Sequence, residues 1–259
     1  GLEIVGVIPA GGEASRIAPL PCSKEIFPIG FRPWGGEGSA DFRPKAACHY
    51  LLESMRAAGA KRVYWILRKG KWDIPEYLGN GNNLGLDLAY LILNLPYGAP
   101  YTVDQAFPFV QNALVLLGFP DILFEPQEAY GRLIEKQRAS QADVVLGLFE
   151  TRQPEKADMV ITDSEGRVQR MVIKEADAGL QYAWVNAVWT PRFTHFMHAY
   201  LQRAMEAVAG LRAEYYVGNV IQAALEEGLR VESVAFPEGT FIDIGTPENL
   251  RAAIKRYVQ

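Results

Sequence analysis

Two short segments are apolar at nearly every position, and they constrain the fold more than any other feature of the chain. Residues 3–8 read EIVGVI and residues 113–118 read ALVLLG. A strand with one face in water alternates polar and apolar side chains, whereas a near-continuous apolar run is typical of a parallel sheet covered on both faces. The two segments therefore predict central strands of such a sheet.

Strand and helix patterns alternate around these two segments up to about residue 150. Further strands are expected at 62–67, 86–93 and 143–149, and helices at 45–59, 74–78, 103–110 and 128–140. Alternation of this kind implies right-handed crossovers between parallel strands. We expect an α/β fold with a doubly wound, mixed but mainly parallel sheet of the Rossmann-like type.

The second half of the chain adds a smaller β element to this sheet. A hairpin is expected over 157–173, with its turn at 163–166, and the later elements are a strand at 182–190, helices at 193–210 and 215–228, strands at 230–236 and 240–245, and a helix at 247–258. There is no internal repeat or linker-like tract. We therefore expect one domain over residues 1–259, made of the halves 1–150 and 151–259.

Charge and cysteine content limit the classes of function. The 259 residues carry a net charge of −4 with acids and bases interspersed, which argues against a nucleic-acid-binding protein or a polybasic membrane anchor. Cys22 and Cys48 have no metal-ligand spacing, so we expect reduced, structural thiols. No apolar run approaches the roughly 20 residues that span a bilayer. These features predict a cytoplasmic protein that contacts neither nucleic acid nor membrane.

The loop after the first strand is too long to be only a connector. Such connectors need about 2–6 residues, whereas residues 9–30 include Gly11, Gly12, Arg16 and Lys24. Glycines let the backbone approach an anion, and an arginine supplies a bidentate fork for phosphate oxygens. Taken alone, the glycine pair is explained more often by a tight turn. The dinucleotide pattern G-x-G-x-x-G and the P-loop pattern are both absent, which argues against a nicotinamide-dependent oxidoreductase.

The ordered set of motifs resembles the sugar-1-phosphate nucleotidyltransferases, including the glucose-1-phosphate thymidylyl- and uridylyltransferases. The family opens with roughly G-G-x-G-T-R-x-x-P…K-x-x-x-P, and this chain has AGGEASRIAPL…SKEIFPIG. Four later segments are similar to family motifs in the same order: YLGNGNNLGLDLAYLI, LVLLGFPDILF, VIKEAD and FIDIGTPENLRAAI. The likeness covers residues 3 to about 257.

The resemblance implies a reaction in which a sugar 1-phosphate oxygen attacks the α-phosphorus of an NTP and pyrophosphate leaves. Catalysis then consists of positioning and charge neutralisation. By the resemblance, Arg16 contacts the triphosphate, Lys24 neutralises the α-phosphate, and Asp121 and Asp243 hold Mg²⁺.

The remaining implied contacts involve the two substrates. The nucleotide is expected at Ala10, Gly11, Gly12, Gln105 and Gly118, with Gln105 on the base. The sugar phosphate is expected at Lys174, with Tyr182 and Asn186 as weaker candidates on a strand that passes the sugar in the family.

Each candidate also has a structural explanation. Arg16 and Lys24 are compatible with charged loop residues that face solvent. Asp121 is compatible with a cap of the segment that follows it, and Asp243 with a side chain that bonds to the backbone in a turn before Gly245. The combined pattern favours function for these four, whereas the two readings of Gln105 and Lys174 are balanced.

The chain departs from the family pattern in five places. Ala14 and Thr102 each replace a glycine, and Ile173 replaces a glutamate that contacts the sugar. Phe119 and Pro120 are inserted before Asp121, and residues 31–41 form an additional glycine-rich loop that either closes over the site or contacts another subunit.

Two hypotheses remain open at this point. One is an active, Mg²⁺-dependent enzyme, for which Glu25 after Lys24 gives UTP a slight preference over dTTP. The other is a regulatory or scaffold protein that binds the nucleotide or nucleotide sugar and turns over poorly. The sugar cannot be identified from the sequence. Many relatives are oligomers, so a homo-oligomer of unspecified size is among the expected partners.

Overall fold

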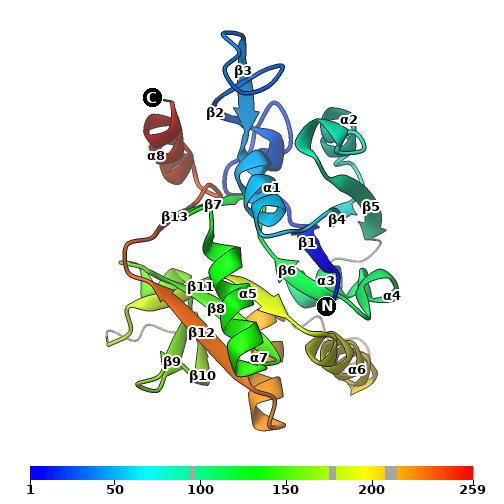
Figure 1. Cartoon of the computed structure of the whole chain (residues 1–259), viewed down its shortest axis with the longest axis vertical. Coiled ribbons are helices and arrows are strands. Elements are labelled where there is room, and N and C mark those ends of the chain that lie inside the picture. The colour runs from blue at the N-terminus through cyan, green and yellow to red at the C-terminus, as the bar shows by residue number, and fades with distance from the viewer. Residues whose placement is uncertain (94–96, 175–178, 208–214, 259) are drawn as a thin grey trace.

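A nine-stranded mixed sheet organises the described residues, which are 1–93, 97–174, 179–207 and 215–258 of this computed structural model (Figure 1). Its strands are β1 (Ile4–Ala10), β4 (Arg62–Arg68), β5 (Asp87–Leu93), β6 (Leu114–Leu117), β8 (Val144–Glu150), β9 (Asp158–Thr162), β10 (Val168–Ile173), β11 (Tyr182–Trp189) and β12 (Val231–Phe236).

The strand order confirms the expected mixed, doubly wound sheet. The path runs β10-β9-β11-β6-β1-β4-β5, and β8 pairs with β11 and β12 off this path. The strands β6, β1, β4 and β5 are mutually parallel, as are β8 and β12, whereas β11 runs antiparallel to β6 and β8. The two apolar segments lie where they are predicted, because β1 and β6 are adjacent central strands with nearly every side chain buried.

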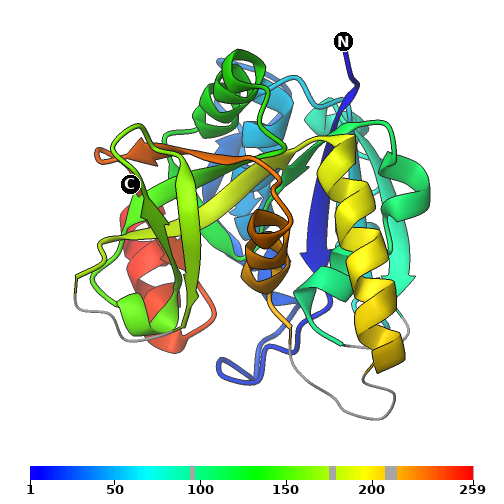
Figure 2. The ribbon, with the colours of Figure 1, turned by 90° about the horizontal axis from the view of Figure 1, so that it is seen from below.

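Helices cover both faces of the sheet (Figure 2). One core contains buried side chains of α1 (Ala47–Ala57), α2 (Asp73–Leu78) and α5 (Ala129–Ser140). The core on the opposite face contains those of α3 (Ala99–Asp104), α4 (Phe107–Val110), α6 (Pro191–Ala207) and α7 (Val217–Glu226). Burial on both faces explains the continuous apolar pattern of the central strands.

Local hydrogen bonds fix where two of the helices begin. At the start of α8 (Pro247–Tyr257), Thr246 Oγ1 accepts a hydrogen bond from the Asn249 N–H at 3.2 Å. At the start of α1, His49 Nδ1 accepts one from the Ala46 N–H at 3.3 Å. Burial, together with the charges of Arg32 and Lys45, lowers the pKa of His49 to about 3, so its ring is neutral and able to accept.

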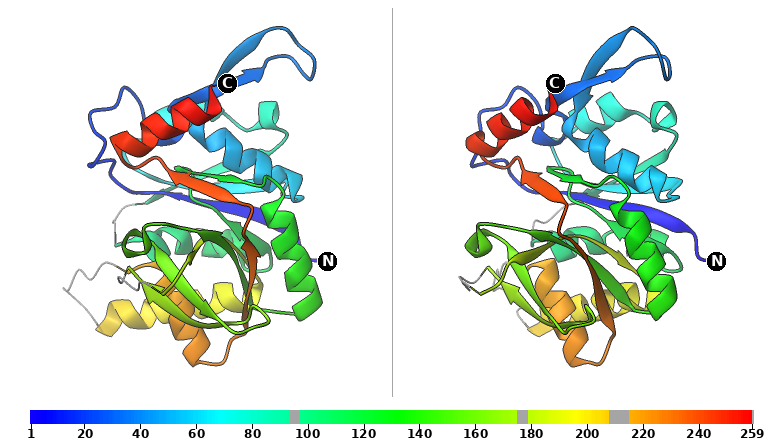
Figure 3. Two further views of the ribbon diagram at one scale, coloured as in Figure 1. Left: turned by 90° about the vertical axis from the view of Figure 1, so that its left-hand side faces the viewer. Right: turned by 60° about the vertical axis from the view of Figure 1, so that its left-hand side comes forward.

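Two further strand pairs correct the sequence expectations. The strand β7 (Ile122–Glu125), which is not predicted, pairs antiparallel with β13 (Thr240–Asp243). The predicted loop 31–41 lies at the tip of a hairpin. Its strands are β2 (Pro28–Pro33) and β3 (Phe42–Ala46), residues 34–41 connect them outside any strand, and the hairpin extends away from the rest of the chain (Figure 3). The strands β2 and β3 have partly exposed side chains and β7 has only four residues, so none of them carries the long apolar run of a buried central strand.

The helix expected at 103–110 is also divided into α3 and α4, with the break at Gln105 and Ala106. Pro108 has no N–H and disfavours a continuous helix through this point. The predicted hairpin, α6 and α7 are present, although residues 208–210 of the expected helix 193–210 lie outside the described residues. No helix in the described part of the chain is long and apolar enough to cross a membrane.

Candidate active site

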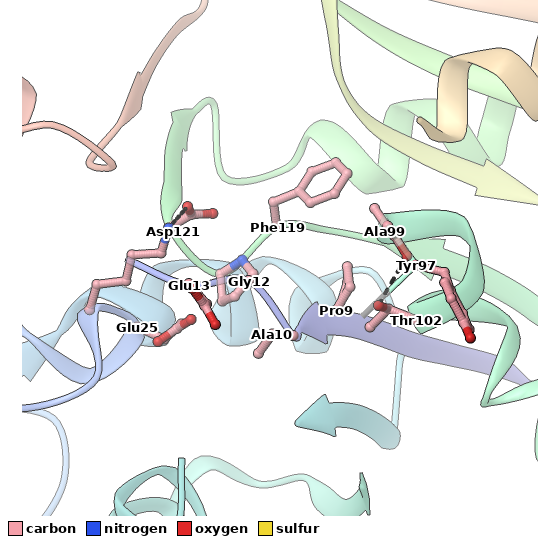
Figure 4. A pocket seen from close by; sticks show the side chains of 14 residues that line it. Pro9, Ala10, Gly12, Glu13, Glu25, Tyr97, Ala99, Thr102, Phe119 and Asp121 are labelled. Atoms are coloured by element: carbon pink, nitrogen blue, oxygen red, sulfur yellow. Dashed lines mark hydrogen bonds and ion pairs between the residues drawn. The ribbon is translucent and has the colours of Figure 1, made fainter. Parts of the chain in front are cut away.

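A cavity of about 590 Å³ lies at the carboxyl end of β1 (Figure 4). Ligands of open α/β sheets bind at such strand ends. The lining residues come from the loop after β1, the start of α3 and the segment after β6: Pro9, Ala10, Gly11, Gly12, Glu13, Lys24, Glu25, Tyr97, Gly98, Ala99, Thr102, Phe119, Pro120 and Asp121.

The loop after β1 depends on Gly11 for close packing. A Cβ on Gly11 would lie 3.0 Å from Leu93 Cδ2 and 3.3 Å from Thr102 Oγ1, which is tight, whereas Gly12 faces open space. Ala14 causes no strain in this loop, because it lacks a positive φ and its carbonyl accepts hydrogen bonds from the N–H groups of Ile17 and Ala18. The loop therefore tolerates a side chain where the resemblance expects glycine.

Four charged side chains predicted from the sequence meet beside the cavity. Lys24 Nζ lies 2.8 Å from Asp121 Oδ2. The pairing of β13 with β7 places Asp243 opposite Ile122, and the Ile244 N–H donates to the Asp121 carbonyl at 3.0 Å. The Arg16 guanidinium lies close to Gly245, because a Cβ added to that glycine would be 2.8 Å from Arg16 Nη2. Segments far apart in the sequence therefore supply one charged cluster of Arg16, Lys24, Asp121 and Asp243.

Acidic and basic groups within this charged cluster shift one another's pKa values. Burial and the charge of Asp121 raise the pKa of Asp243, although the Gly245 N–H, Lys24 and Arg16 act in the opposite direction. Burial acts to lower the pKa of Lys24, but Asp121, Glu25 and Asp243 outweigh it and the pKa is raised. Lys24 is thus a stable cation that partly neutralises the two carboxylates.

The carboxylates of Asp121 and Asp243 fit a magnesium ion, which prefers one or two carboxylates together with phosphate oxygens. Burial raises the pKa of Asp243 most, and the negative charge of Asp121 raises it further. No group of three or more His, Cys, Asp and Glu side chains arranged to hold a metal occurs in the part of the chain that the structure describes. Substrate oxygens would have to complete the coordination of such an ion.

Polar contacts made by its two sequence neighbours hold Lys24 in place. The N–H and hydroxyl of Ser23 both donate to the Asp73 carboxylate at 2.7 Å. Glu25 accepts a hydrogen bond from Lys71 Nζ at 2.5 Å, and these two residues are only 2% and 5% exposed. Because Ser23 and Glu25 flank Lys24, both pairs orient the short 3-10 helix Lys24–Ile26 that contains it.

Replacing Lys71 by methionine should destabilise the protein, because the Glu25 carboxylate would stay buried without its counter-charge. The expected loss in the free energy of unfolding is about 3 kcal/mol, typical of breaking a buried ion pair. The double variant Lys71→Met/Glu25→Gln should recover most of that loss. Urea unfolding of the two single variants and the double variant measures this, and additive losses would contradict a direct coupling.

The predicted nucleotide contacts are distributed unevenly. Ala10, Gly11 and Gly12 line the cavity, whereas Gln105 and Gly118 do not. The exposed Gln105 side chain donates to the Tyr101 carbonyl at 3.3 Å. Gly118 packs closely, since a Cβ there would lie 2.4 Å from Leu51 Cδ1 and 2.5 Å from Tyr130 Oη. The structure assigns Gly118 a packing role.

The predicted sugar contacts lie outside the lining of this cavity. Lys174 Nζ lies 3.9 Å from the centre of the Tyr216 ring, and Tyr182 is partly buried at the start of β11. Asn186 is fully buried, and a Cβ on Gly147 would clash with its amide oxygen. Its amide therefore lies against the neighbouring strand β8, and Asn186 does not line the cavity.

Several lining residues are absent from the sequence predictions. They are Pro9, Glu13, Glu25 and the residues around the start of α3, together with Phe119 and Pro120. Thr102, whose hydroxyl donates to the Gly98 carbonyl at 3.2 Å, lines the cavity three residues before Gln105. The inserted Phe119-Pro120 pair, which the sequence marks as a departure from the family pattern, forms part of the lining.

Comparison with known proteins gives one family and a consistent fold. The profile of the nucleotidyl transferase family matches residues 5–259. The chain is 23% identical over 255 residues to the low-salt glycan biosynthesis nucleotidyltransferase Agl11 of Haloferax volcanii, a match that covers 96% of this chain and 64% of that protein. It is 24% identical over 252 residues to a glucose-1-phosphate thymidylyltransferase of Mycolicibacterium smegmatis, covering 95% and 79% of the two chains.

Solved structures show the same fold. The chain superposes on the UTP-bound UGPase of Acinetobacter baumannii with a TM-score of 0.76 and 17% identity, over 99% of this chain and 93% of the other. The superposition extends over nearly all of both chains, so it includes the elements that surround the cavity.

Proposed function

The chain belongs to the nucleotidyl transferase family, and on that premise we propose that it transfers a nucleotidyl group from an NTP to a sugar 1-phosphate. The products are a nucleotide sugar and pyrophosphate. One observation carries this proposal: Arg16, Lys24, Asp121 and Asp243 meet beside a cavity of about 590 Å³. That volume lies within the range of small-molecule sites, roughly 300–1,000 Å³.

The charged cluster suits an in-line displacement at the α-phosphorus. An oxygen of the sugar phosphate forms the new P–O bond, and the bond to the pyrophosphate oxygen breaks. Lys24, held by the contacts of Ser23 and Glu25, is placed to neutralise charge on the α-phosphate. Arg16 is placed to contact the leaving pyrophosphate. No covalent enzyme intermediate is required, so positioning and charge neutralisation account for the rate.

Asp121 and Asp243 would hold Mg²⁺, which when bound neutralises phosphate charge. The protein's own contribution is to keep the two carboxylates near each other through the pairing of β7 with β13. Lys24 Nζ lies 2.8 Å from Asp121 Oδ2, which keeps the ammonium group beside the two carboxylates.

We favour UTP or dTTP as the nucleotide. Support comes from Glu25 directly after Lys24 and from relatives named for thymidylyl transfer and for bound UTP. One relative is named a mannose-1-phosphate guanylyltransferase, so GTP belongs in any test. The Tyr97–Thr102 wall lies at the opposite end of the cavity from Asp121 and is our candidate for the base contact (Figure 4).

We also propose that residues 1–259 act as one domain in the cytoplasm, where its substrates occur. The first half supplies Asp121 and the second half supplies Asp243, so neither half has the complete charged cluster.

A substrate panel tests the proposal. UTP, dTTP, GTP, ATP and CTP are each combined with glucose 1-phosphate, mannose 1-phosphate, galactose 1-phosphate or N-acetylglucosamine 1-phosphate in the presence of Mg²⁺. Pyrophosphate release is expected only when a nucleotide and a sugar phosphate are both present. Nucleotide binding by calorimetry without release from any pair would instead favour the regulatory or scaffold hypothesis.

A further inference from the structure

The amino end of α3 forms one wall of the cavity, and the carboxyl end of the same helix is joined to α6. Gly98, Ala99 and Thr102 line the cavity at the start of α3, whereas Asp104 is the last residue of the helix. Asp104 Oδ2 lies 2.9 Å from Nδ1 of His198, which belongs to α6. A helix that contacts the ligand space at one end is therefore attached to α6 at the other.

A helix as short as α3 depends on its tertiary contacts for its position. Isolated helices shorter than about 12–15 residues are marginal in water, and α3 has only six residues. Its apolar side chains Tyr101 and Val103 pack in the core. Within the part of the chain that the structure describes, the contact of Asp104 with His198 is the only ion pair or side-chain hydrogen bond that joins α3 to another helix or strand.

The His198 ring is itself held in one orientation. Phe107, the first residue of α4, stacks on it with ring centroids 3.7 Å apart and planes 5° from parallel. Nδ1 lies 2.9 Å and 3.1 Å from the two carboxylate oxygens of Asp104. Because a carboxylate only accepts hydrogen bonds, Nδ1 is the donor. His198 is thus a fixed attachment point for the carboxyl end of α3.

The stability of the fold does not explain a carboxylate at this position. The Asp104 side chain is only 9% exposed, and this burial raises its pKa although the hydrogen bond and charge of His198 oppose the shift. A carboxyl group with a raised pKa disfavours the folded protein at neutral pH. The carboxyl end of a helix also disfavours negative charge. Departures of this kind from the local rules are typical of functional positions.

We propose that Asp104 and His198 are positioning residues that hold the Tyr97–Thr102 wall in the orientation that receives the nucleotide base. Neither side chain lines the cavity, so the pair acts through α3. At about 1.5 Å per residue α3 is roughly 9 Å long, and a displacement at Asp104 therefore reaches the wall. This inference rests on the proposed nucleotidyl transfer and identifies what sets the affinity for its first substrate.

Calorimetric titration separates base recognition from phosphate recognition. The probes are UTP, dTTP and GTP, together with inorganic tripolyphosphate, which has three phosphates but no base. All are titrated with Mg²⁺ and without a sugar 1-phosphate, so that no turnover occurs.

Four variants and one matched control are compared. The variants are His198→Leu, Asp104→Ala, the double variant of these two, and His198→Asn, whose amide places an N–H donor near the position of Nδ1. His195→Leu is the control. His195 precedes His198 by three residues on α6 and contacts Phe107 edge-on at 5.3 Å, but it makes no ion pair or hydrogen bond with any of the described residues.

His198→Leu and Asp104→Ala should each weaken the nucleotide that binds best about three- to tenfold, the range that one hydrogen bond contributes, and tripolyphosphate less than about twofold. The double variant should bind no more weakly than either single variant, because the two residues act as one unit. His198→Asn should bind the nucleotide within about twofold of the unaltered protein. His195→Leu should bind both kinds of probe as the unaltered protein does.

Thermal unfolding checks that the variants are folded. Asp104→Ala should unfold at no lower temperature than the unaltered protein, because it removes a carboxylate whose burial disfavours folding at neutral pH. This variant therefore tests the pair even if His198→Leu is unstable.

Four results would overturn the inference. Unchanged nucleotide affinity in Asp104→Ala would remove the pair from nucleotide binding and leave the proposed function intact. Equal weakening of the nucleotide and tripolyphosphate would indicate a general structural role. Additive weakening in the double variant would mean that the two residues act separately. If the unaltered protein binds no nucleotide, the proposed function fails together with the inference.

Discussion

Replacing Asp243 by asparagine is expected to slow turnover about a thousandfold, since metal-assisted charge stabilisation supplies several kcal/mol in such reactions. Asparagine keeps the acceptor for the Gly245 N–H, which donates to Oδ1 at 2.8 Å, and so preserves the local turn. It removes the negative charge that would attract the magnesium ion. Steady-state pyrophosphate release with the best substrate pair measures the change.

The same variant should not lose stability, and this separates a functional loss from unfolding. The pKa of Asp243 is raised in the folded protein, by burial first and then by Asp121. The folded protein favours the neutral form of such a carboxyl group, so the stability that its protonation contributes is lost as the pH rises through the folded pKa. Asparagine is neutral at every pH, and Asp243→Asn should therefore unfold at an equal or higher temperature near neutral pH.

Asp143→Asn is the matched control for Asp243→Asn. Asp143 is a buried carboxylate, whereas Asp243 is half-buried. Asp143 accepts a hydrogen bond from the Arg230 N–H at 2.8 Å, and it lies outside the charged cluster. Its replacement should lower stability while the folded protein keeps near-normal turnover. Near-normal turnover in Asp243→Asn would remove this residue from the metal site.

Replacing Lys24 by methionine is the second change with a large expected effect. Loss of a cation that stabilises a phosphoryl-transfer transition state costs about 10³-fold or more. The Lys24 ammonium is the group 2.8 Å from Asp121, and its raised pKa keeps it charged at neutral pH. We expect turnover to fall by that factor, with a smaller change in the KM for the NTP, in steady-state assays.

Lys45→Met provides a close control for Lys24→Met. The Lys45 side chain is 14% exposed and makes a 2.8 Å ion pair with Glu53, and both values equal those of Lys24 with Asp121. Lys45 does not line the cavity. Similar losses of turnover in the two variants would mean that breaking a shielded ion pair lowers turnover wherever the pair lies. The position of Lys24 beside the cavity would then not explain its effect.

Much of the fold can be predicted from the sequence because burial leaves a strong pattern. Strands β1 and β6 are covered on both faces, so their apolar runs identify them directly. Strands β2, β3 and β7 are partly exposed and leave no such pattern. The division of the expected helix 103–110 depends on Pro108, whose effect on a helix of this length is hard to weigh without tertiary contacts.

The candidate site is less predictable because it depends on strand pairing. The inserted Phe119 and Pro120 raise the expectation that Asp121 is displaced, yet β7 pairs with β13 and brings Asp121 beside Asp243. Ile173 shows the same limitation. Its register partner on the neighbouring strand is Asp158, so a carboxylate lies next to the position where the resemblance expects an acidic residue. Neither pairing can be read from local sequence.

Isotope labelling of the sugar phosphate tests nucleotidyl transfer most directly. The sugar 1-phosphate of the NTP and sugar phosphate pair with the highest turnover is prepared with ¹⁸O in its non-bridging phosphate oxygens. The masses of the products are then determined by mass spectrometry. Attack by the sugar phosphate on the α-phosphorus predicts a nucleotide sugar that keeps all of the label and pyrophosphate that has none. Label in the pyrophosphate, or no labelled nucleotide sugar from any pair, would contradict the proposed reaction.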